Sequence, residues 1–227
     1  MRNQYSEFLE GARDIMPLAF GVAIYGSAFG LLAAQANMSS LQTALMGFFV
    51  FAGSSQIIAA ERLVAEAGIL SAAVAGIAIN LRLFLMTAAL QPELRGRPIW
   101  QIMFATHITC DENWSLMYAT RRKGKEAGFQ YLLGGGAVLL VIWLSSTSLS
   151  VSFAQLLPKP ESIGMDFAFS AAFIAILCGL WRGKEDIFPW MTAIFSTILM
   201  VHLTPIEPSW ALAVGGLTGA VSDGYLS

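Results

Sequence analysis

The sequence predicts an all-α integral membrane protein with about eight transmembrane helices in a single domain of residues 1–227. Three observations lead to this prediction: 56% of the residues are hydrophobic, only 12% are charged, and the mean hydropathy is +0.64. A soluble domain usually carries about a quarter charged residues. In water, a folded chain this apolar would also expose large hydrophobic patches.

Eight apolar runs approach the length that a bilayer-spanning helix needs, about 20 mostly apolar residues. Polar breaks separate the runs, and several breaks, such as "QPELRGRP" and "TPIEP", contain Pro or Gly, which end helices. The breaks are too short to separate two folded domains. The candidate spans are 15–36, 40–61, 68–90, 99–119, 129–151, 165–181, 187–203 and 208–226.

The basic residues predict the orientation. With eight crossings, the side that holds both termini carries nine basic residues and the other side carries three. Because cytoplasmic loops are enriched in Lys and Arg, both termini are expected in the cytoplasm; seven crossings would weaken this asymmetry. The nine are Arg2, Arg13, Arg62, Arg121, Arg122, Lys123, Lys125, Arg182 and Lys184, the three are Arg95, Arg97 and Lys159, and Arg82 lies within a span.

The two halves of the chain share a weak internal similarity. "MPLAFGVA" (16–23) resembles "MDFAFSAA" (165–172), and "AVAG" (73–76) resembles "AVGG" (213–216). In the eight-span arrangement these pairs cross the membrane in opposite directions, as inverted transporter repeats do. Segments so rich in Ala, Gly and Phe also match by chance, so both interpretations stay open.

The second span, which includes "FFVFAGSSQIIAAE" (48–61), has Gly53, Ser54, Ser55 and Gln56 near its centre. Gly weakens a helix, Ser can bond back to the preceding turn, and Gln offers both a donor and an acceptor. One interpretation is an unwound or kinked segment that faces a polar cavity, where transporters bind substrate. The alternative is helix packing through small residues and modest interhelical hydrogen bonds.

The third span contains Asn80 and Arg82 in "GIAINLRLFLM". Two residues apart, they point to different faces of a regular helix. Arg82 stays charged and therefore needs a carboxylate, backbone carbonyls or water at membrane depth. If it lies close to the interface, its side chain could instead extend to the headgroups.

The fourth span contains His107, Asp111 and Glu112 in "FATHITCDENWSLMYA". His107 and Asp111 are four residues apart, which predicts one helix face and a possible proton relay. Asp111 or Glu112 could equally be the counter-ion of Arg82, or both acids could be hydrated near the interface. Asp166, at the start of the sixth span, is a lesser candidate because an Asp there is also a good helix N-cap.

Other function classes find little support. The net charge of −2 argues against nucleic-acid binding, and the two cysteines, Cys110 and Cys178, form no zinc or disulfide pattern. The chain contains neither a GxSxG elbow nor an HExxH helix. We therefore expect no enzymatic activity, no metal and no cofactor.

Five segments in order resemble the AzlC-type family: "PLAFGVAIYGSAFGLLA", "FAGSSQ", "AINLRLFLMTAAL", "DENW" and "GMDFAFSAAF". The resemblance covers about residues 11–181, and the strongest family motifs fall on 51–56, 80–82 and 166–167. It implies the large subunit of a bacterial branched-chain amino-acid exporter, sometimes carrying methionine, in the cytoplasmic membrane. It also implies a small AzlD-type membrane partner.

Residues and resemblance together give one mechanistic hypothesis, a secondary transporter with alternating access. Ser54, Ser55, Gln56 and exposed backbone amides would bind the substrate carboxylate, with Arg82 adding positive potential. Asp111 or Glu112 would face the ammonium group, and Phe51, Phe84 and nearby aliphatic residues would line the side-chain slot. Proton coupling would run through His107 and Asp111. The alternatives are a scaffold subunit whose partner carries the substrate, and a channel for a small solute.

Overall fold

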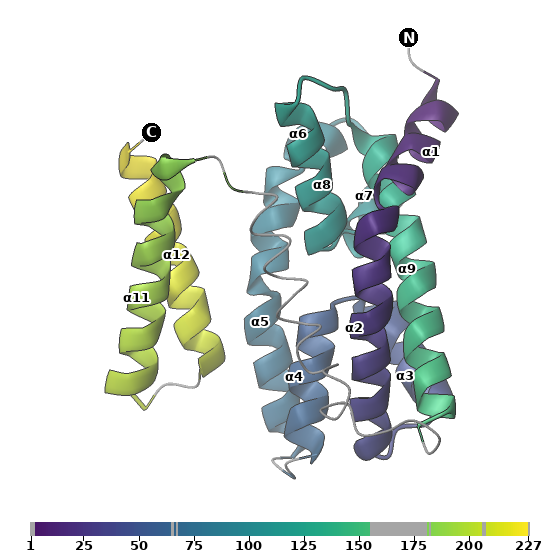
Figure 1. Cartoon of the computed structure of the whole chain (residues 1–227), viewed down its shortest axis with the longest axis vertical. Coiled ribbons are helices and arrows are strands. Elements are labelled where there is room, and N and C mark those ends of the chain that lie inside the picture. Colours follow the sequence, from purple (N-terminus) through teal and green to yellow (C-terminus); the bar gives the residue numbers. More distant parts are fainter. Residues whose placement is uncertain are drawn as a thin grey trace.

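The computed structural model describes residues 3–64, 66, 68–154, 181, 183–205 and 208–226. These residues form helices joined by turns and contain no strand, which confirms the predicted all-α class. The predicted span 165–181, apart from Trp181, lies outside the described residues. Asp166 and the second copy of the first repeat motif lie outside them as well, so these predictions stay predictions. The helices that hold the second pair of motifs, 73–76 and 213–216, both run toward the upper end in Figure 1, so the predicted inversion of this pair is wrong.

Long helices run side by side along the length of the molecule (Figure 1). Within the described residues, three segments are long and apolar enough to cross a membrane: 16–35, 129–152 and 184–203. Together with the all-helical architecture, they make the chain an integral membrane protein. The long helices are α2 (Met16–Gln35), α5 (Ile69–Ala89), α9 (Phe129–Ser152), α11 (Ile187–Leu203), which follows the short 3-10 helix η2 (Lys184–Asp186), and α12 (Pro208–Leu226).

The second predicted span is two short helices that turn back on themselves. Helix α3 (Ser40–Val50) starts where the Ser40 hydroxyl contacts Ser152 near the end of α9, and it reaches the middle of the molecule. The chain turns at Phe51–Ala52, and α4 (Gly53–Val64) returns toward the end from which α3 came. Figure 1 shows both helices in the lower half of the molecule. The pair is therefore a re-entrant hairpin.

A second re-entrant hairpin enters from the opposite end. After α6 (Gln91–Leu94), α7 (Ile99–His107) descends to the middle, and α8 (Asp111–Arg122) returns to the upper end in Figure 1. On that return, the Tyr118 hydroxyl donates a 3.0 Å hydrogen bond to the Ala89 carbonyl at the end of α5. Where the two hairpins approach each other, the His107 ring lies 5.8 Å from the Phe48 ring.

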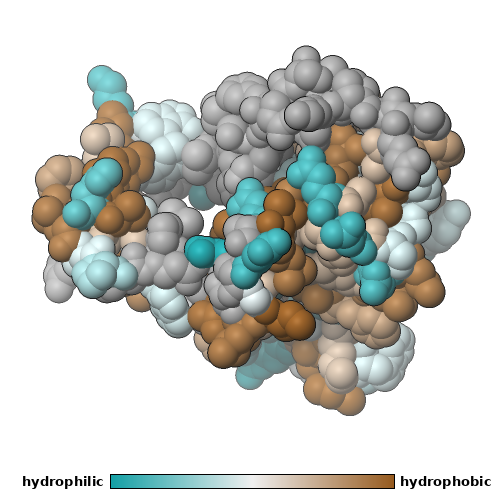
Figure 2. Space-filling model, turned by 90° about the horizontal axis from the view of Figure 1, so that it is seen from below, coloured by the Kyte–Doolittle hydropathy of each residue, from teal (hydrophilic) through white to brown (hydrophobic). Residues whose placement is uncertain are grey.

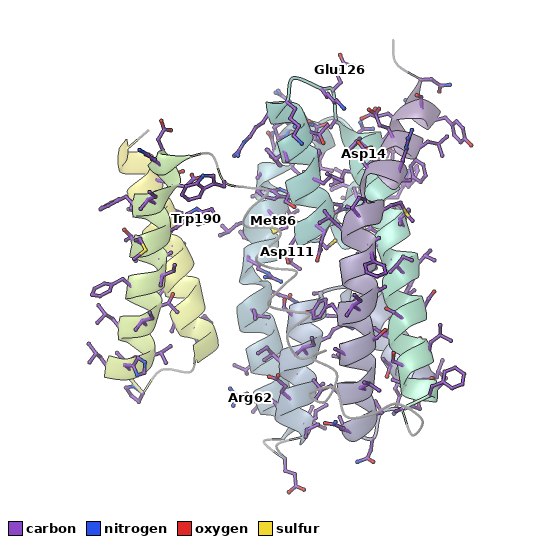
Figure 3. The ribbon with its side chains drawn as sticks, viewed as in Figure 1. Asp14, Arg62, Met86, Asp111, Glu126 and Trp190 are labelled. Atoms are coloured by element: carbon purple, nitrogen blue, oxygen red, sulfur yellow. The ribbon has the colours of Figure 1, made fainter. Side chains whose placement is uncertain are left out.

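The hairpins confirm the predicted interrupted helix but change the predicted path of the chain. Segments 40–61 and 99–119 each return to the end where they began, so neither is a continuous span. The loop 95–98 before α7 therefore lies at the same end of the molecule as both termini (Figure 1). Arg62 lies at the other end (Figure 3). Among the described basic residues outside the spans, the end with the termini holds Arg13, Arg95, Arg97, Arg121, Arg122, Lys123, Lys125 and Lys184. Of the nine such described residues only Arg62 lies at the other end, a division of eight to one, whereas eight crossings would divide the same nine residues seven to two.

Close helix packing holds the framework together. Helix α2 packs along α9, and a Cβ on Gly30 would lie 2.5 Å from the Thr147 carbonyl oxygen, so only glycine permits this approach. Higher on the same pair, the rings of Tyr25 and Phe29 pack against Trp143 at centroid distances of 5.2 and 5.6 Å. The N-terminal helix α1 (Gln4–Asp14) packs on the start of α9, where Glu7 accepts a 2.7 Å hydrogen bond from the Gly128 N–H.

The outer surface is apolar, as a lipid environment requires. On α11, Phe188 and Phe195 are largely exposed, as is Phe20 on α2. Figure 2, which views the molecule from below, shows hydrophobic side chains along much of the outline of the described surface. Because lipid solvates apolar side chains, these residues need no protein partner.

Candidate functional site

The tips of the two re-entrant hairpins meet halfway along the molecule. The first tip is Phe51–Ala52 and the second is 108–110, between His107 and Asp111. Between them lies a cavity of about 30 Å³. Its walls come from α2, both hairpins and α9, and are formed by Val22, Tyr25, Phe51, Gly53, Cys110, Glu112, Leu139 and Trp143.

The break in the first hairpin lies just before the four residues that suggested it. Gly53, Ser54, Ser55 and Gln56 form the first turn of α4, and the Gln56 N–H already bonds to the Ala52 carbonyl at 3.0 Å. The expectation that these four residues are themselves unwound is therefore wrong. The break instead directs the N-terminus of α4, with its unpaired backbone N–H groups and partial positive charge, at the centre of the protein.

The polar side chains of this first turn attach α4 to its neighbours. The Ser55 hydroxyl donates a 3.0 Å hydrogen bond to the Gly76 carbonyl on α5. Gln56 is fully buried, and its Oε1 accepts a 2.9 Å hydrogen bond from Trp143 Nε1 on α9. Among the described residues, Gln56 Nε2 has no hydrogen-bond partner. Ser55 and Gln56 thus hold the tip in place.

Arg82 links the two hairpins. Its Nη2 donates to the Ser54 hydroxyl on α4 and forms a 2.8 Å ion pair with Asp111 at the start of α8. The side chains of Arg82 and Asp111 are 31% and 20% exposed, so the pair is largely desolvated. Asp111 is therefore the counter-ion of Arg82, and the alternative in which Arg82 extends to the headgroups is wrong. Asn80 is half-buried, and its Oδ1 has no partner among the described residues.

The break between α7 and α8 shows that the prediction of one helix face shared by His107 and Asp111 is wrong. His107 is the last residue of α7 and Asp111 is the first residue of α8, so the two do not share a regular helix. Asn113 explains the break, because its Oδ1 accepts a 2.8 Å hydrogen bond from the Cys110 N–H. Its Nδ2 donates to the carbonyls of Ile108 at 3.0 Å and Leu132 at 3.2 Å. One buried amide thus replaces helical hydrogen bonds and fastens the tip to α9.

Asn113, Tyr25 and Trp143 belong to the site but were not among the predicted site residues. An Asn at the third position of a helix can cap its start, but in "CDENW" the two acids before it are the stronger signal of a functional site at membrane depth. The aromatic residues stand in apolar runs where lipid exposure is equally common. Their burial, at 5% and 3% exposure, follows from packing between α2, α4 and α9.

Glu112 supplies the cavity with a carboxylate. It lines the cavity, whereas its neighbour Asp111 is paired with Arg82. Figure 3 shows Asp111 at the mid-level of the molecule, with Asp14 and Glu126 far above it. The cavity therefore joins a carboxylate, the N-terminal backbone of α4 and an apolar wall that includes Phe51. The prediction that Phe84 belongs to the same wall is wrong, because its side chain is 74% exposed on the outer surface of α5. The described residues contain no group of three or more His, Cys, Asp or Glu that could hold a metal ion.

Known proteins with similar sequences include a transport protein and membrane proteins. Over 212 residues, the chain is 24% identical to the branched-chain amino acid transport protein AzlC of Bacillus subtilis, covering 89% of this chain and 81% of that protein. It is also 23% identical to an uncharacterized membrane protein of Helicobacter pylori over 186 residues, covering 79% and 80% of the two chains. No solved structure matches. The sequence model of the family described as AzlC protein matches residues 17–157, and the chain therefore belongs to the AzlC family.

Proposed function

We propose that this chain is the large subunit of a secondary transporter that exports branched-chain amino acids. Membership of the AzlC family and the name of the Bacillus subtilis relative support a transport role. The observation that carries the proposal is the meeting of two re-entrant tips around a buried cavity with a carboxylate. Transporters commonly place substrate sites at interrupted helices near the membrane midplane.

The cavity offers complementary groups for a zwitterion. The N-terminus of α4, starting at Gly53, provides backbone N–H groups and a partial positive charge for the substrate carboxylate. Glu112 provides the negative charge for the ammonium group. Val22, Phe51 and Leu139 form the apolar wall, where each buried methylene stabilises binding by about 0.8 kcal/mol. Methionine fits the same chemistry because its side chain is also apolar and flexible.

Arg82 has a different role from direct binding in this proposal. Since Asp111 neutralises it, its positive charge contributes less to substrate affinity than the α4 N-terminus does. The ion pair instead couples the first turn of α4 to the first turn of α8 through Ser54. A movement of either hairpin therefore strains or breaks contacts of the other. We propose the same region, with Glu112 and His107 as candidate proton carriers, for coupling to an ion gradient.

Substrate entry requires movement of the helices. The cavity of about 30 Å³ has room for little more than one water molecule, whereas small-molecule sites typically measure about 300–1,000 Å³. The structure is thus consistent with a closed conformation of an alternating-access cycle. In the proposal, the hairpins open the cavity toward each side in turn, and a small AzlD-type membrane subunit supports the complex in the bacterial cytoplasmic membrane.

The proposal is tested by reconstituting in vesicles the chain alone, the small partner alone and both together, and by measuring efflux of labelled leucine from each. We expect efflux that needs this chain, is slowed by unlabelled valine or isoleucine, and shows counterflow exchange. Flux without counterflow would indicate a channel. Full efflux from the partner alone would make this chain a scaffold, and either result would overturn the proposed role.

A further inference from the structure

A groove on the outer surface lies apart from the central cavity. It has a volume of about 440 Å³ and lies where the end of α5, helix α6 and the middle of α7 converge. Phe84, Ala88, Leu94 and Ile102 form its apolar wall, and Gln91 and Arg95 form its polar end. The groove is thus amphipathic along its length, from the apolar part of α5 to the turn after α6.

The groove lies at the membrane boundary on the side of the basic loops. Its polar end belongs to the loop between α5 and α7, which lies at the same end as both termini (Figure 1). Next to it, the first turns of α7 expose Ile99, Trp100 and Met103 by 70%, 65% and 64%. Exposed aromatic residues such as Trp100 are typical of the membrane interface. The apolar wall therefore opens toward lipid tails and the polar end toward headgroups.

The other charged residues of this loop are already engaged. Glu93 forms a 2.5 Å ion pair with Arg121. The Arg97 guanidinium donates to the Glu93 carbonyl at 2.7 Å and lies 3.5 Å from the centre of the Phe129 ring. Arg95, by contrast, is exposed at the end of the groove, and no carboxylate of the described residues forms an ion pair with it. Its charge is complementary to a phosphate.

We propose that this groove binds an anionic phospholipid, with an acyl chain along Phe84 and Ile102 and the phosphate at Arg95. The order of chemistry along the membrane normal, first cationic and then apolar, is the order in a phospholipid. A hydrophobic helix of another protein would cover the apolar wall but leave Arg95 without an anion. Basic pockets at helix ends near the membrane surface are suited to anionic headgroups.

The test measures lipid retention by native mass spectrometry of the purified full-length protein. The probes are palmitoyl-oleoyl phosphatidylglycerol, the matching phosphatidylcholine and inorganic phosphate. Two variants probe the groove: Arg95→Gln removes the charge, and Ala88→Phe fills the apolar wall while Arg95 remains. Lys123→Gln removes a charge of the same sign from an exposed loop at the same end of the molecule and is the matched control.

We expect phosphatidylglycerol to be retained at least fivefold better than phosphatidylcholine, and each groove variant to remove most of that preference. Lys123→Gln should leave it unchanged. An equal loss in Lys123→Gln would indicate diffuse charge attraction and overturn the site. Competition by millimolar inorganic phosphate would make it a simple anion site. An unchanged preference in Ala88→Phe would exclude the acyl chain from the groove.

Discussion

Arg82 on α5 and Asp111 at the start of α8 form a 2.8 Å ion pair at the point where two re-entrant hairpins meet. The same guanidinium donates to Ser54 on the other hairpin. One side chain on α5 therefore joins α4 of the first hairpin to α8 of the second. In a low-dielectric interior, such a pair is sensitive to the loss of either partner, because the remaining charge is left uncompensated.

Neutralising one partner of this pair should destabilise the protein, whereas neutralising both should largely restore it. We expect Arg82→Gln or Asp111→Asn to lower the free energy of unfolding by about 1–3 kcal/mol, less than for a fully buried pair because both side chains retain some exposure. Arg82→Gln combined with Asp111→Asn should recover most of the loss. Thermal denaturation in detergent gives the double-mutant cycle. Strict additivity of the two losses would show that the residues are not energetically coupled.

Glu112 should be needed for transport but not for folding. Glu112→Gln keeps the size of the side chain and removes the charge that faces the cavity, so leucine efflux should fall by at least tenfold. Glu126→Gln, the same change in an exposed loop far from the cavity (Figure 3), should leave efflux unchanged. Efflux from vesicles with equal amounts of each folded variant provides the measurement. Normal efflux by Glu112→Gln would remove this residue from the proposed site.

Asn113 should position the second tip. Asn113→Ala removes hydrogen bonds to the Cys110 N–H and to the carbonyls of Ile108 and Leu132. Buried backbone groups left unsatisfied cost about 1–3 kcal/mol each, although water entry would reduce the total, so we expect a loss of about 2–4 kcal/mol. In a Cys178→Ala background, maleimide should also label Cys110 faster. An unchanged labelling rate despite lower stability would show that Asn113 stabilises the fold without positioning the tip.

The two re-entrant hairpins predict on which side of the membrane each loop lies, and this prediction differs from that of eight continuous spans. Single cysteines at Pro92, Lys123 and Glu66, in a Cys110→Ala and Cys178→Ala background, report on three loops. The structure predicts that Pro92→Cys and Lys123→Cys share one side and that Glu66→Cys lies on the other. Eight continuous spans would instead put Lys123→Cys and Glu66→Cys together. An impermeant thiol reagent applied to intact cells distinguishes the two arrangements.

Local chemistry determined the parts of this protein that sequence analysis predicted correctly. Apolar runs of about 20 residues have few stable conformations in lipid other than the helix, because every backbone group needs an internal partner. Gly53 and the polar residues after it marked a weak point in the second span. Arg82, Asp111 and Glu112 were recognisable because charged groups at membrane depth need partners.

The tertiary structure decided the direction of the chain after each break. A polar interruption looks the same in sequence whether the helix continues or turns back, because lipid surrounds apolar residues equally well in both cases. Packing of α4 on α5, and the hydrogen bonds from Asn113 to Ile108 and Leu132, favour the return. In the same packing, Asp111 and not Glu112 forms the ion pair with Arg82. The order of residues along the chain thus shows which side chains are costly in a membrane, and their arrangement in three dimensions shows how that cost is offset.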